Sequence, residues 1–360
     1  MKVVSILGTR PDIIKMWSTL KKLDELNFEH IMVYTGQNFT PELRDFFFRD
    51  LELRAPNYEL NIDTSGYAAE VADIIVKSDA MLEKEKPDAV VLLGDTFSAL
   101  SILPASQRGI KTFHMEAGLR AYDKRMPEQR NRMLIDHLSS ILLPFNDYAR
   151  NNLIRENIHP SKIFVTGNPT FEVLRAFEQK IHGSDVLTRL NIKPKEYILA
   201  TAHRSENVDN PQYLAGFMRA FGNMAEKFGK QVIYPMHPRT KSKLGSIEIP
   251  KGVTVMAPLG YYDFNKLQAN AFCIVSDSGT PPEEALFFRV PVVSLRMTTE
   301  RPETVEAGGH IIAGVDADNI VDSVETVTRE PYAARYDLNE NFQASNVVVN
   351  CIRSQITNWF

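Results

Sequence analysis

The chain has 360 residues, more than a single hydrophobic core usually organises, so two domains are expected. Apolar residues make up 44% and charged residues 24% of the sequence, as in an ordinary globular enzyme. The net charge of −4 argues against a nucleic-acid partner. No apolar run approaches the roughly 18 residues of a membrane span, and residues 1–8 resemble a strand rather than a signal peptide. Cys273 and Cys351 lie in apolar contexts that predict buried thiols, and together these features predict a cytoplasmic protein.

Strand-like runs alternate with amphipathic helical segments in the first half of the chain. Strands are predicted at residues 3–7, 31–34, 89–93, 112–114, 141–143 and 163–165. Helices are predicted between them at residues 13–26, 41–48, 67–83, 97–107 and 129–138. Continuous Val, Ile and Leu runs separated by helices indicate a parallel sheet that is covered on both faces.

The same pattern restarts after the turn residues 165–169. Strands are predicted at residues 197–200, 232–235, 253–255, 272–275, 290–295 and 310–313, with a long helix at 211–228. This predicts an α/β fold of two doubly wound Rossmann-like domains, residues 1–168 and 169–343, with ligands in the cleft that faces the carboxyl ends of both sheets. Residues 344–359 are predicted to be helical, and the segment 344–360 is expected to pack back on the first domain.

Several common catalytic motifs are missing from the sequence. There is neither a G-x-G-x-x-G dinucleotide fingerprint nor a Walker A loop, which disfavours a nicotinamide dehydrogenase and a P-loop kinase. No spacing of His, Cys, Asp and Glu resembles a zinc site, and no G-x-S-x-G elbow or Cys-His signature is present.

Basic residues follow the first predicted strand. The run Gly8-Thr9-Arg10-Pro11 permits a tight turn into a helix, and Arg10 and Lys15 would lie near the start of that helix. There they could meet a diphosphate. A solvated basic helix end is the alternative, which the strand-end position disfavours.

Three carboxylates occupy strand ends or a helix start in the first domain: Asp95, Glu116 and Glu128. Asp95 could be a helix N-cap, and Glu128 could complement a helix dipole. Glu116 is harder to explain as structure, because a carboxylate at the end of a buried strand needs a partner. Their convergence on one cleft would favour acid/base chemistry over three independent caps.

The second domain repeats this arrangement of polar residues after strands. His203 follows its first strand and would face the cleft, as would His237, for which a hydrogen-bonded loop histidine is an equally good reading. Ser278-Gly279 lies at a strand-to-helix turn whose bare N–H groups would suit phosphate, and Glu284 one turn later could hold a sugar diol. Together with the polar run 298–303, these residues predict a pocket for a nucleotide sugar.

These motifs together resemble the non-hydrolysing UDP-N-acetylglucosamine 2-epimerases over nearly the whole chain. The matching runs are Gly8-Thr9-Arg10-Pro11, Gly94-Asp95-Thr96, His114-Met115-Glu116-Ala117-Gly118-Leu119-Arg120, Pro127-Glu128 with Asn131-Arg132, Val165-Thr166-Gly167-Asn168, Ala202-His203-Arg204, Asp277-Ser278-Gly279 with Glu283-Glu284, and Thr299-Glu300-Arg301-Pro302-Glu303. The resemblance implies a GT-B-like fold, a UDP-sugar substrate, no cofactor or metal, and a homodimer.

The resemblance also implies a reaction. A base removes the C2 proton while UDP leaves C1, and the resulting 2-acetamidoglycal is protonated on its other face as UDP returns. The residues that the resemblance assigns to acid/base work are Asp95, Glu116 and Glu128, with His203 near the diphosphate or the C1 oxygen. Those that it assigns to substrate binding are Arg10, Lys15, His203, Phe264, Ser278, Gly279, Glu284 and Arg301.

Some runs depart from the usual epimerase pattern. Gly279-Thr280-Pro281-Pro282 stands where Gly-Gly-Ile-Gln is usual, and residues 35–39 replace a Gln-His-Arg motif tied to allosteric UDP-GlcNAc binding. These departures look more like the branch that converts UDP-2-acetamido-2,6-dideoxy-L-talose into UDP-N-acetyl-L-fucosamine for capsule or O-antigen. A hydrolysing epimerase, a GT-B glycosyltransferase and a non-catalytic nucleotide-sugar sensor remain alternatives.

Overall fold

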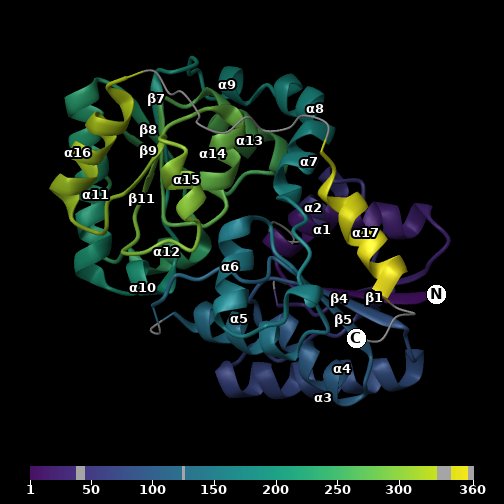
Figure 1. Cartoon of the computed structure of the whole chain (residues 1–360). Helices are drawn as coiled ribbons and strands as arrows, with labels where there is room; N and C mark the ends of the chain where they lie inside the picture. The colour runs from purple at the N-terminus through teal and green to yellow at the C-terminus, as the bar shows by residue number, and fades with distance from the viewer. Residues whose placement is uncertain (38–44, 124–125, 331–341, 356–360) are drawn as a thin grey trace. The chain divides into compact units, whose positions relative to one another are not determined.

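The computed structural model describes residues 1–37, 45–123, 126–330 and 342–355. Two compact units make up the chain (Figure 1). The first comprises Met1–Val173 and the C-terminal segment that holds α17 (Ala344–Gln355), and the second runs from Leu174 to Asn339. The division falls within helix α7 (Pro169–Ala176), a few residues beyond the boundary at 168/169 expected from the sequence.

A parallel sheet forms the centre of the first unit. Within the described residues its strands are β1 (Lys2–Leu7), β2 (Glu29–Tyr34), β3 (Tyr58–Glu59), β4 (Ala89–Leu93), β5 (Lys111–Met115) and β6 (Ile141–Leu143). Their order is β3-β2-β1-β4-β5-β6, and every paired strand is parallel to its neighbour. This is the strand order of dinucleotide-binding Rossmann domains.

Helices cover both faces of this sheet. One face packs its Val and Ile side chains against α3 (Tyr67–Glu85), the 3₁₀ helix η1 (Phe97–Ser101), α4 (Ile102–Gln107) and α5 (Pro127–Leu138). The other face carries α1 (Arg10–Glu25), against which α17 lies (Figure 1). The remaining helices of this unit are α2 (Asp45–Asp50), α6 (Asp147–Arg155) and the 3₁₀ helix η2 (Pro160–Lys162).

The second unit repeats this architecture. Its described strands are β7 (Tyr197–Thr201), β8 (Gln231–Pro235), β9 (Val253–Met256), β10 (Cys273–Ser276), β11 (Val292–Ser294) and β12 (His310–Ile312). They lie in the order β12-β11-β10-β7-β8-β9. Counted from β7, this is the strand order of the first unit.

Alternation along the strands separates the two cores of the second sheet. Ile198 and Ala200 face a core shared with α11 (Pro211–Phe228) and α16 (Ala317–Thr328), whereas Tyr197 and Leu199 face α9 (Val186–Arg189), α13 (Tyr261–Asn270) and α14 (Pro281–Phe288). The other helices are α8 (Glu178–Gly183), α10 (Ser205–Val208), α12 (Pro238–Lys243) and α15 (Pro302–Glu306).

Each sheet has one point at which the strand order reverses direction. It lies between β1 and β4 in the first unit and between β7 and β10 in the second. In open α/β sheets, ligands bind outside the carboxyl ends of the strands at such a switch point. The loops after these four strands are therefore where a site is expected. They contain Asp95, His203 and Ser278, and Arg10 is the first residue of the helix that follows β1.

The α/β fold with two parallel sheets is confirmed, and the local differences have physical reasons. The predicted strand 163–165 is reduced to one bridge, between Ile163 and Leu142, and the two-residue strand β3 was not predicted. The predicted helix 97–107 divides into η1 and α4, because Pro104 has no N–H for a continuous helix but is tolerated in the first turn of α4.

Two predicted helices lie partly outside the described residues. Helix 41–48 is described from Asp45, where α2 begins, and helix 344–359 is described as far as Gln355. None of the helices in the described part of the chain is long and apolar enough to cross a membrane. Both cysteines are buried free thiols, as predicted.

Candidate functional site

A close-packed turn joins β1 to α1 in the first unit. Thr9 is the N-cap of α1, and the Asp12 carboxylate accepts hydrogen bonds of 2.9 Å from the N–H groups of both Gly8 and Thr9. A Cβ on Gly8 would lie 1.7 Å from Ser98 Oγ, so only glycine allows the turn to pack against η1. This packing holds the start of α1 beside the end of β4. At the first residue of α1, the guanidinium of Arg10 lies 5.6 Å from the ring centroid of Phe47.

Glu116 has an unusual backbone conformation at the end of β5. Its φ is +63°, in the left-handed region that non-glycine residues seldom adopt, and the residue is 5% exposed. Two glycines with positive φ flank it. Gly94 lies beside its side chain, and Gly118 follows it by two residues in the sequence. Such conformations cost about 1–3 kcal/mol and cluster at functional sites. The strained backbone marks Glu116 as a candidate functional residue.

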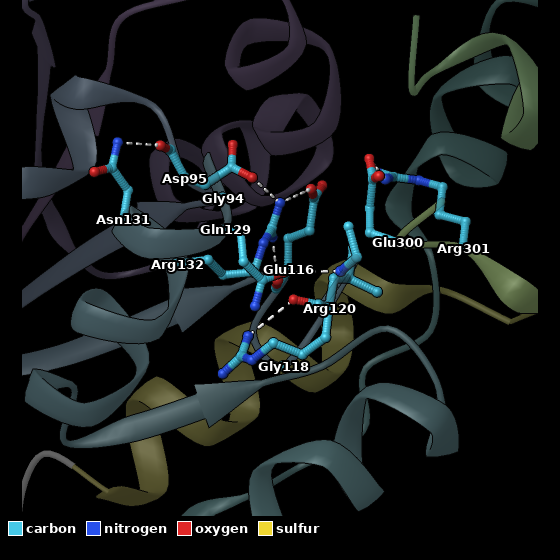
Figure 2. Close-up of polar contacts among 12 residues, drawn as sticks. Gly94, Asp95, Glu116, Gly118, Arg120, Gln129, Asn131, Arg132, Glu300 and Arg301 are labelled. Atoms are coloured by element: carbon cyan, nitrogen blue, oxygen red, sulfur yellow. Dashed lines mark hydrogen bonds and ion pairs between the residues drawn. The ribbon is translucent and has the colours of Figure 1, made fainter. Parts of the chain in front are cut away.

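Two cations hold the carboxylate of Glu116. Lys15 Nζ on α1 lies 2.6 Å from Glu116 Oε2. Arg132 Nη2 on α5 lies 3.2 Å from Glu116 Oε1 (Figure 2). Arg132 also donates through Nη1 to the Glu116 carbonyl at 2.7 Å, and through Nη2 to the carboxylate of Asp95. The side chains of Asp95 and Glu116 therefore share one guanidinium. Asp95 is the more exposed of the two, with 20% of its side chain accessible against 6% for Glu116.

Helix α5 supplies much of this cluster. Asn131 donates through its side-chain nitrogen to the Asp95 carbonyl at 3.1 Å, and Arg132 bridges the two carboxylates. Glu128 is the second residue of the helix and half-buried, and it precedes Arg132 by one turn on the same helix face. The structure thus brings Lys15, Asp95 and Glu116 into one cluster and positions Glu128 on the helix that completes it.

Asp12 is a second buried carboxyl group near Glu116. Burial raises the pKa of Asp12 to about 7, although hydrogen bonds from Gly8 and Thr9 oppose the rise and the charge of Glu116 adds to it. Asp12 is 2% exposed. The first unit therefore holds a carboxyl group that exchanges its proton near neutral pH beside the Glu116 cluster.

An Asp–His pair occupies the switch point of the second unit. Asp277 directly follows β10 and is fully buried, and its Oδ2 accepts N–H hydrogen bonds of 2.9 Å from both His203 and Arg204. Its Oδ1 lies 3.4 Å from His203 Nδ1. Asp277 therefore fixes the backbone after β7 and orients the imidazole of His203, whose side chain is 30% exposed.

His237, the second histidine considered from the sequence, caps a helix. It is the N-cap residue of α12, and its Nδ1 accepts a hydrogen bond from Arg239 N at 3.1 Å. Its ring centroid lies 5.6 Å from that of His203. This favours the reading of His237 as a hydrogen-bonded loop histidine.

The turn after β10 offers fewer free backbone N–H groups than the expected phosphate site. The N–H of Ser278 is not bare, because it donates to Ser276 Oγ at 3.0 Å. Helix α14 begins with Pro281 and Pro282, which have no N–H groups to offer an anion. Backbone donors at this helix start are therefore fewer than the sequence motif suggested, and positive charge has to come from side chains.

Arginines supply that charge beside Gly279. A Cβ on Gly279 would lie 3.0 Å from Glu300 Oε1 and 3.5 Å from Arg301 Nη1. Glu300 pairs with Arg296 at 2.7 Å. It also pairs with Arg301 at 2.6 Å, and Figure 2 shows these two residues. Burial alone would raise the pKa of Glu300, but the charges of Arg296, Arg301 and Arg204 outweigh it and hold the pKa well below its usual value.

Further carboxyl groups complete this cluster. Glu283 Oε1 lies 2.8 Å from Arg301 Nε, and both residues are buried. Burial raises the pKa of Glu303, in the first turn of α15, to about 7. The guanidinium of Arg301 is thus held by Glu283 and Glu300 at the edge of the turn that carries Gly279.

Glu284 and Phe264 lie on neighbouring helices of the second unit. Glu284 on α14 is 3% exposed, and its Oε2 accepts a hydrogen bond of 2.7 Å from Gln268 Nε2 on α13. Phe264, also on α13, is partly buried against the core on that face of the sheet. The sequence-predicted residues divide between the units, with Arg10, Lys15, Asp95, Glu116 and Glu128 in the first and His203, Phe264, Ser278, Gly279, Glu284 and Arg301 in the second.

Sequence reasoning gave no role to three residues that organise these clusters. They are Arg132, Asp277 and Glu300, and all three stand in runs that the sequence analysis singled out. Asp277 could have been found from its place directly after a strand. The role of Arg132 depends on a long side chain that reaches Asp95 and Glu116, and that of Glu300 depends on its position beside Gly279. Among the described residues, no group of three or more His, Cys, Asp or Glu side chains is arranged to hold a metal ion.

The fold and the charged clusters together define a class of protein. Two doubly wound units, each with polar and charged residues at the switch point of its sheet, are the GT-B-like architecture of proteins that handle nucleotide sugars. The sequence model described as UDP-N-acetylglucosamine 2-epimerase matches residues 21–353. The chain belongs to this family, whose members are isomerases.

Individual relatives agree with this assignment. The UDP-N-acetylglucosamine 2-epimerase of Methanococcus maripaludis is 37% identical over 339 residues, covering 91% of this chain and 92% of the relative. A UDP-2,3-diacetamido-2,3-dideoxy-D-glucuronate 2-epimerase of Pseudomonas aeruginosa is 32% identical, covering 91% and 92%. The crystal structure of Methanocaldococcus jannaschii UDP-GlcNAc 2-epimerase in complex with UDP-GlcNAc and UDP superposes with a TM-score of 0.91 at 34% identity, covering 98% of this chain and all of that one.

Proposed function

We propose that this protein is a non-hydrolysing 2-epimerase of a UDP-linked N-acetylhexosamine. The reaction breaks the C2–H bond and the bond between C1 and the UDP oxygen, and it forms the C1=C2 double bond of a 2-acetamidoglycal. A proton then adds to C2 on the opposite face, and the UDP oxygen rejoins C1. Atoms and charge balance without an oxidant, because the proton and UDP that leave are replaced when the glycal reacts again.

The observation that carries the proposal is the carboxylate cluster at the switch point of the first unit. Asp95 and Glu116 are held side by side through Arg132, and Glu128 begins the same helix. Inversion at C2 requires groups that can take a proton from one face and give one to the other. The carboxylates of Asp95, Glu116 and Glu128 would supply such groups. Because Lys15 is buried against Glu116, we propose that it orients this carboxylate.

We assign UDP binding to residues of the second unit. Ser278 and Gly279 line the phosphate region with Arg301 beside them, Glu284 holds the ribose diol, and Phe264 lies near the uracil. The proposal is supported by the arginine cluster beside Gly279, since departure of UDP from C1 needs fixed positive charge near the diphosphate. His203, oriented by Asp277, serves the diphosphate or the C1 oxygen.

For the sugar itself, we propose the UDP-2-acetamido-2,6-dideoxy-L-talose and UDP-N-acetyl-L-fucosamine pair, with UDP-GlcNAc and UDP-ManNAc as the second candidate. The departure at residues 280–282 motivates the first choice, because two prolines change the donors at the start of α14. The P. aeruginosa relative is named for a third sugar, so this family includes members for different UDP-sugars. The product would enter surface polysaccharide such as capsule or O-antigen.

The purified protein is incubated in D2O and followed by NMR. The three substrates are UDP-2-acetamido-2,6-dideoxy-L-talose, UDP-GlcNAc and UDP-2,3-diacetamido-2,3-dideoxy-D-glucuronate. We expect deuterium at C2 and the C2 epimer with one sugar far faster than with the others, and no free UDP. If none of the sugars gains deuterium or yields an epimer, the proposed function is wrong.

The same experiment separates the alternatives. A hydrolysing epimerase would release UDP at every turnover, and a glycosyltransferase would leave C2 unexchanged and need an acceptor. A sensor would bind UDP and exchange nothing.

We also propose a cytoplasmic homodimer that works without a bound cofactor, metal, nucleic acid or membrane. Light scattering coupled to size-exclusion chromatography would give the mass in solution, and 40.8 kDa would indicate a monomer instead. Activity that survives exhaustive chelation would agree with a metal-free reaction.

A further inference from the structure

A buried chain of polar contacts runs behind the carboxylates of the first unit. His114 on β5 is fully buried, and its Nε2 donates to the Gly94 carbonyl at 2.7 Å. Its Nδ1 lies 2.8 Å from Asp136 Oδ1 on α5. Arg120 approaches the other oxygen of Asp136 at 2.7 Å and forms an ion pair with Glu156 at 2.6 Å.

This chain ends next to both site carboxylates. Gly94 immediately precedes Asp95, and its N–H donates to the Met115 carbonyl at 3.0 Å. Asp136 Oδ2 also accepts the N–H of Gly118 at 3.1 Å. Asp136 thereby holds His114 and Gly118, which stand two residues before and two residues after Glu116.

Asp136 can do this because it is ionised. Burial alone would raise its pKa, but the hydrogen bond from His114 and the charges of His114 and Arg120 outweigh burial and lower the pKa. A buried carboxylate accepts several hydrogen bonds at once and resists displacement. Its partners are therefore fixed relative to one another, and Glu116 is kept in its strained left-handed conformation between them.

We infer that His114 and Asp136 are positioning residues that hold the peptides carrying Asp95 and Glu116 in the geometry needed for proton transfer. The inference rests on the proposed epimerase function of those two carboxylates. Neither His114 nor Asp136 needs to touch the substrate. Positioning matters because an error of about 1 Å at a reacting group can cost roughly 100-fold in rate.

The same unit contains a matched control. His30 Nδ1 lies 2.6 Å from Asp24 Oδ1, its Nε2 lies 2.7 Å from Ser5 Oγ, and Arg54 Nε donates to Asp24 at 3.0 Å. This is again an Arg–Asp–His chain, and its histidine lies on a strand of the same sheet. It lies at the first residues of β2, the strand end opposite the switch point, so its loss should affect stability without affecting catalysis.

Two substitutions at His114 separate positioning from mere structure. The amide nitrogen of His114→Gln reaches the place of Nε2 and can still donate to Gly94, whereas His114→Asn places its amide near Nδ1 and loses that bond. We expect His114→Asn and Asp136→Asn to lower kcat about 100-fold with little change in KM or in the dissociation constant of UDP. His114→Gln should keep most of kcat, and Asp24→Asn should keep all of it despite a lower melting temperature.

Equal loss of kcat in His114→Gln and His114→Asn, or the same loss in Asp24→Asn, would overturn the inference. If Asp136→Asn does not fold, the His114 pair decides alone. If the unsubstituted protein epimerises none of the UDP-sugars, the proposed function has failed by itself. Crystal structures of the His114 variants then test positioning, with displaced Asp95 and Glu116 carboxylates in His114→Asn supporting it and unmoved ones overturning it.

Discussion

At the scale of single residues, the candidate site depends on charges that stabilise one another. Arg132 is 3% exposed and would be costly to bury alone, but Asp95 and Glu116 pair with it and Lys15 offsets the second carboxylate. Removing one partner leaves an uncompensated buried charge. The cluster is therefore rigid and well suited to proton transfer between fixed groups.

Neutral, isosteric substitutions test the carboxylates directly. We expect Asp95→Asn, Glu116→Gln and Glu128→Gln each to cut turnover about 100-fold or more, because an amide cannot accept or return the C2 proton. Circular dichroism should show that the fold is retained, and epimer formation followed by NMR gives the turnover. Asp79→Asn, which removes an exposed ion pair with Arg108, is the control and should leave turnover unchanged. Near-normal activity in all three site variants would refute the assignment.

At the scale of secondary-structure elements, close packing positions the loops that carry the site. Gly8 lets the β1–α1 turn approach η1, and Pro104 divides η1 from α4. In the second unit, His310 on β12 joins Ser294 on β11 at 2.6 Å and Thr304 on α15 at 2.8 Å. The contacts of Gly8 and His310 join elements that are separate in the sequence, so both can be tested through stability.

A methyl group at Gly8 should disrupt the first unit. In Gly8→Ala, the new Cβ would meet Ser98 Oγ, Thr35 Oγ1 and Ser98 Cβ at 1.7, 2.5 and 2.7 Å, so backbone as well as side chains must move. We expect a loss of about 3 kcal/mol in the free energy of unfolding, measured by urea titration. Gly183→Ala, whose Cβ would meet nothing within 4 Å, is the control and should change stability by less than about 0.5 kcal/mol. Equal stability of the two variants would contradict the packing.

Acid should weaken the contact made by His310. Burial and, to a smaller extent, the charge of Arg296 lower the pKa of His310 to about 4, although the charge of Glu300 opposes the shift. The unfolded chain binds a proton near pH 6.5, so stability is complete above that pH and falls by about 3 kcal/mol as the pH drops toward 4. His310→Gln should lose less stability over this interval than the unsubstituted protein, as measured by hydrogen exchange at β11 and β12. His159→Gln, at an exposed histidine, should behave like the unsubstituted protein, and an identical pH profile for His310→Gln would contradict the prediction.

At the scale of the whole molecule, two sheets of the same strand order carry different chemistry. The first unit presents a carboxylate cluster at its switch point, and the second presents an Asp–His pair and an arginine cluster. This difference predicts that UDP alone binds through the second unit. Family membership agrees with a nucleotide-sugar substrate. The D2O assay identifies the sugar.

Binding of UDP to the full chain should protect mainly the second unit. We expect slower hydrogen exchange in the loops that follow β7 and β10. In Ser278→Ala, the dissociation constant of UDP should be several-fold higher. Asp95→Asn should leave that constant nearly unchanged, because the proposed role of its carboxylate is on the sugar. Protection confined to the first unit, or an unchanged constant in Ser278→Ala, would contradict this division of roles.

The sequence alone determined the α/β class, the repetition of the strand pattern and the strand-end positions of Asp95, Glu116 and His203. Such features follow from apolar periodicity and from turn residues, which are local. Only the tertiary structure decided that Arg132 joins two carboxylates and that Asp136 holds both sides of Glu116. Side chains from distant segments make these contacts, and no local pattern specifies which of them will meet.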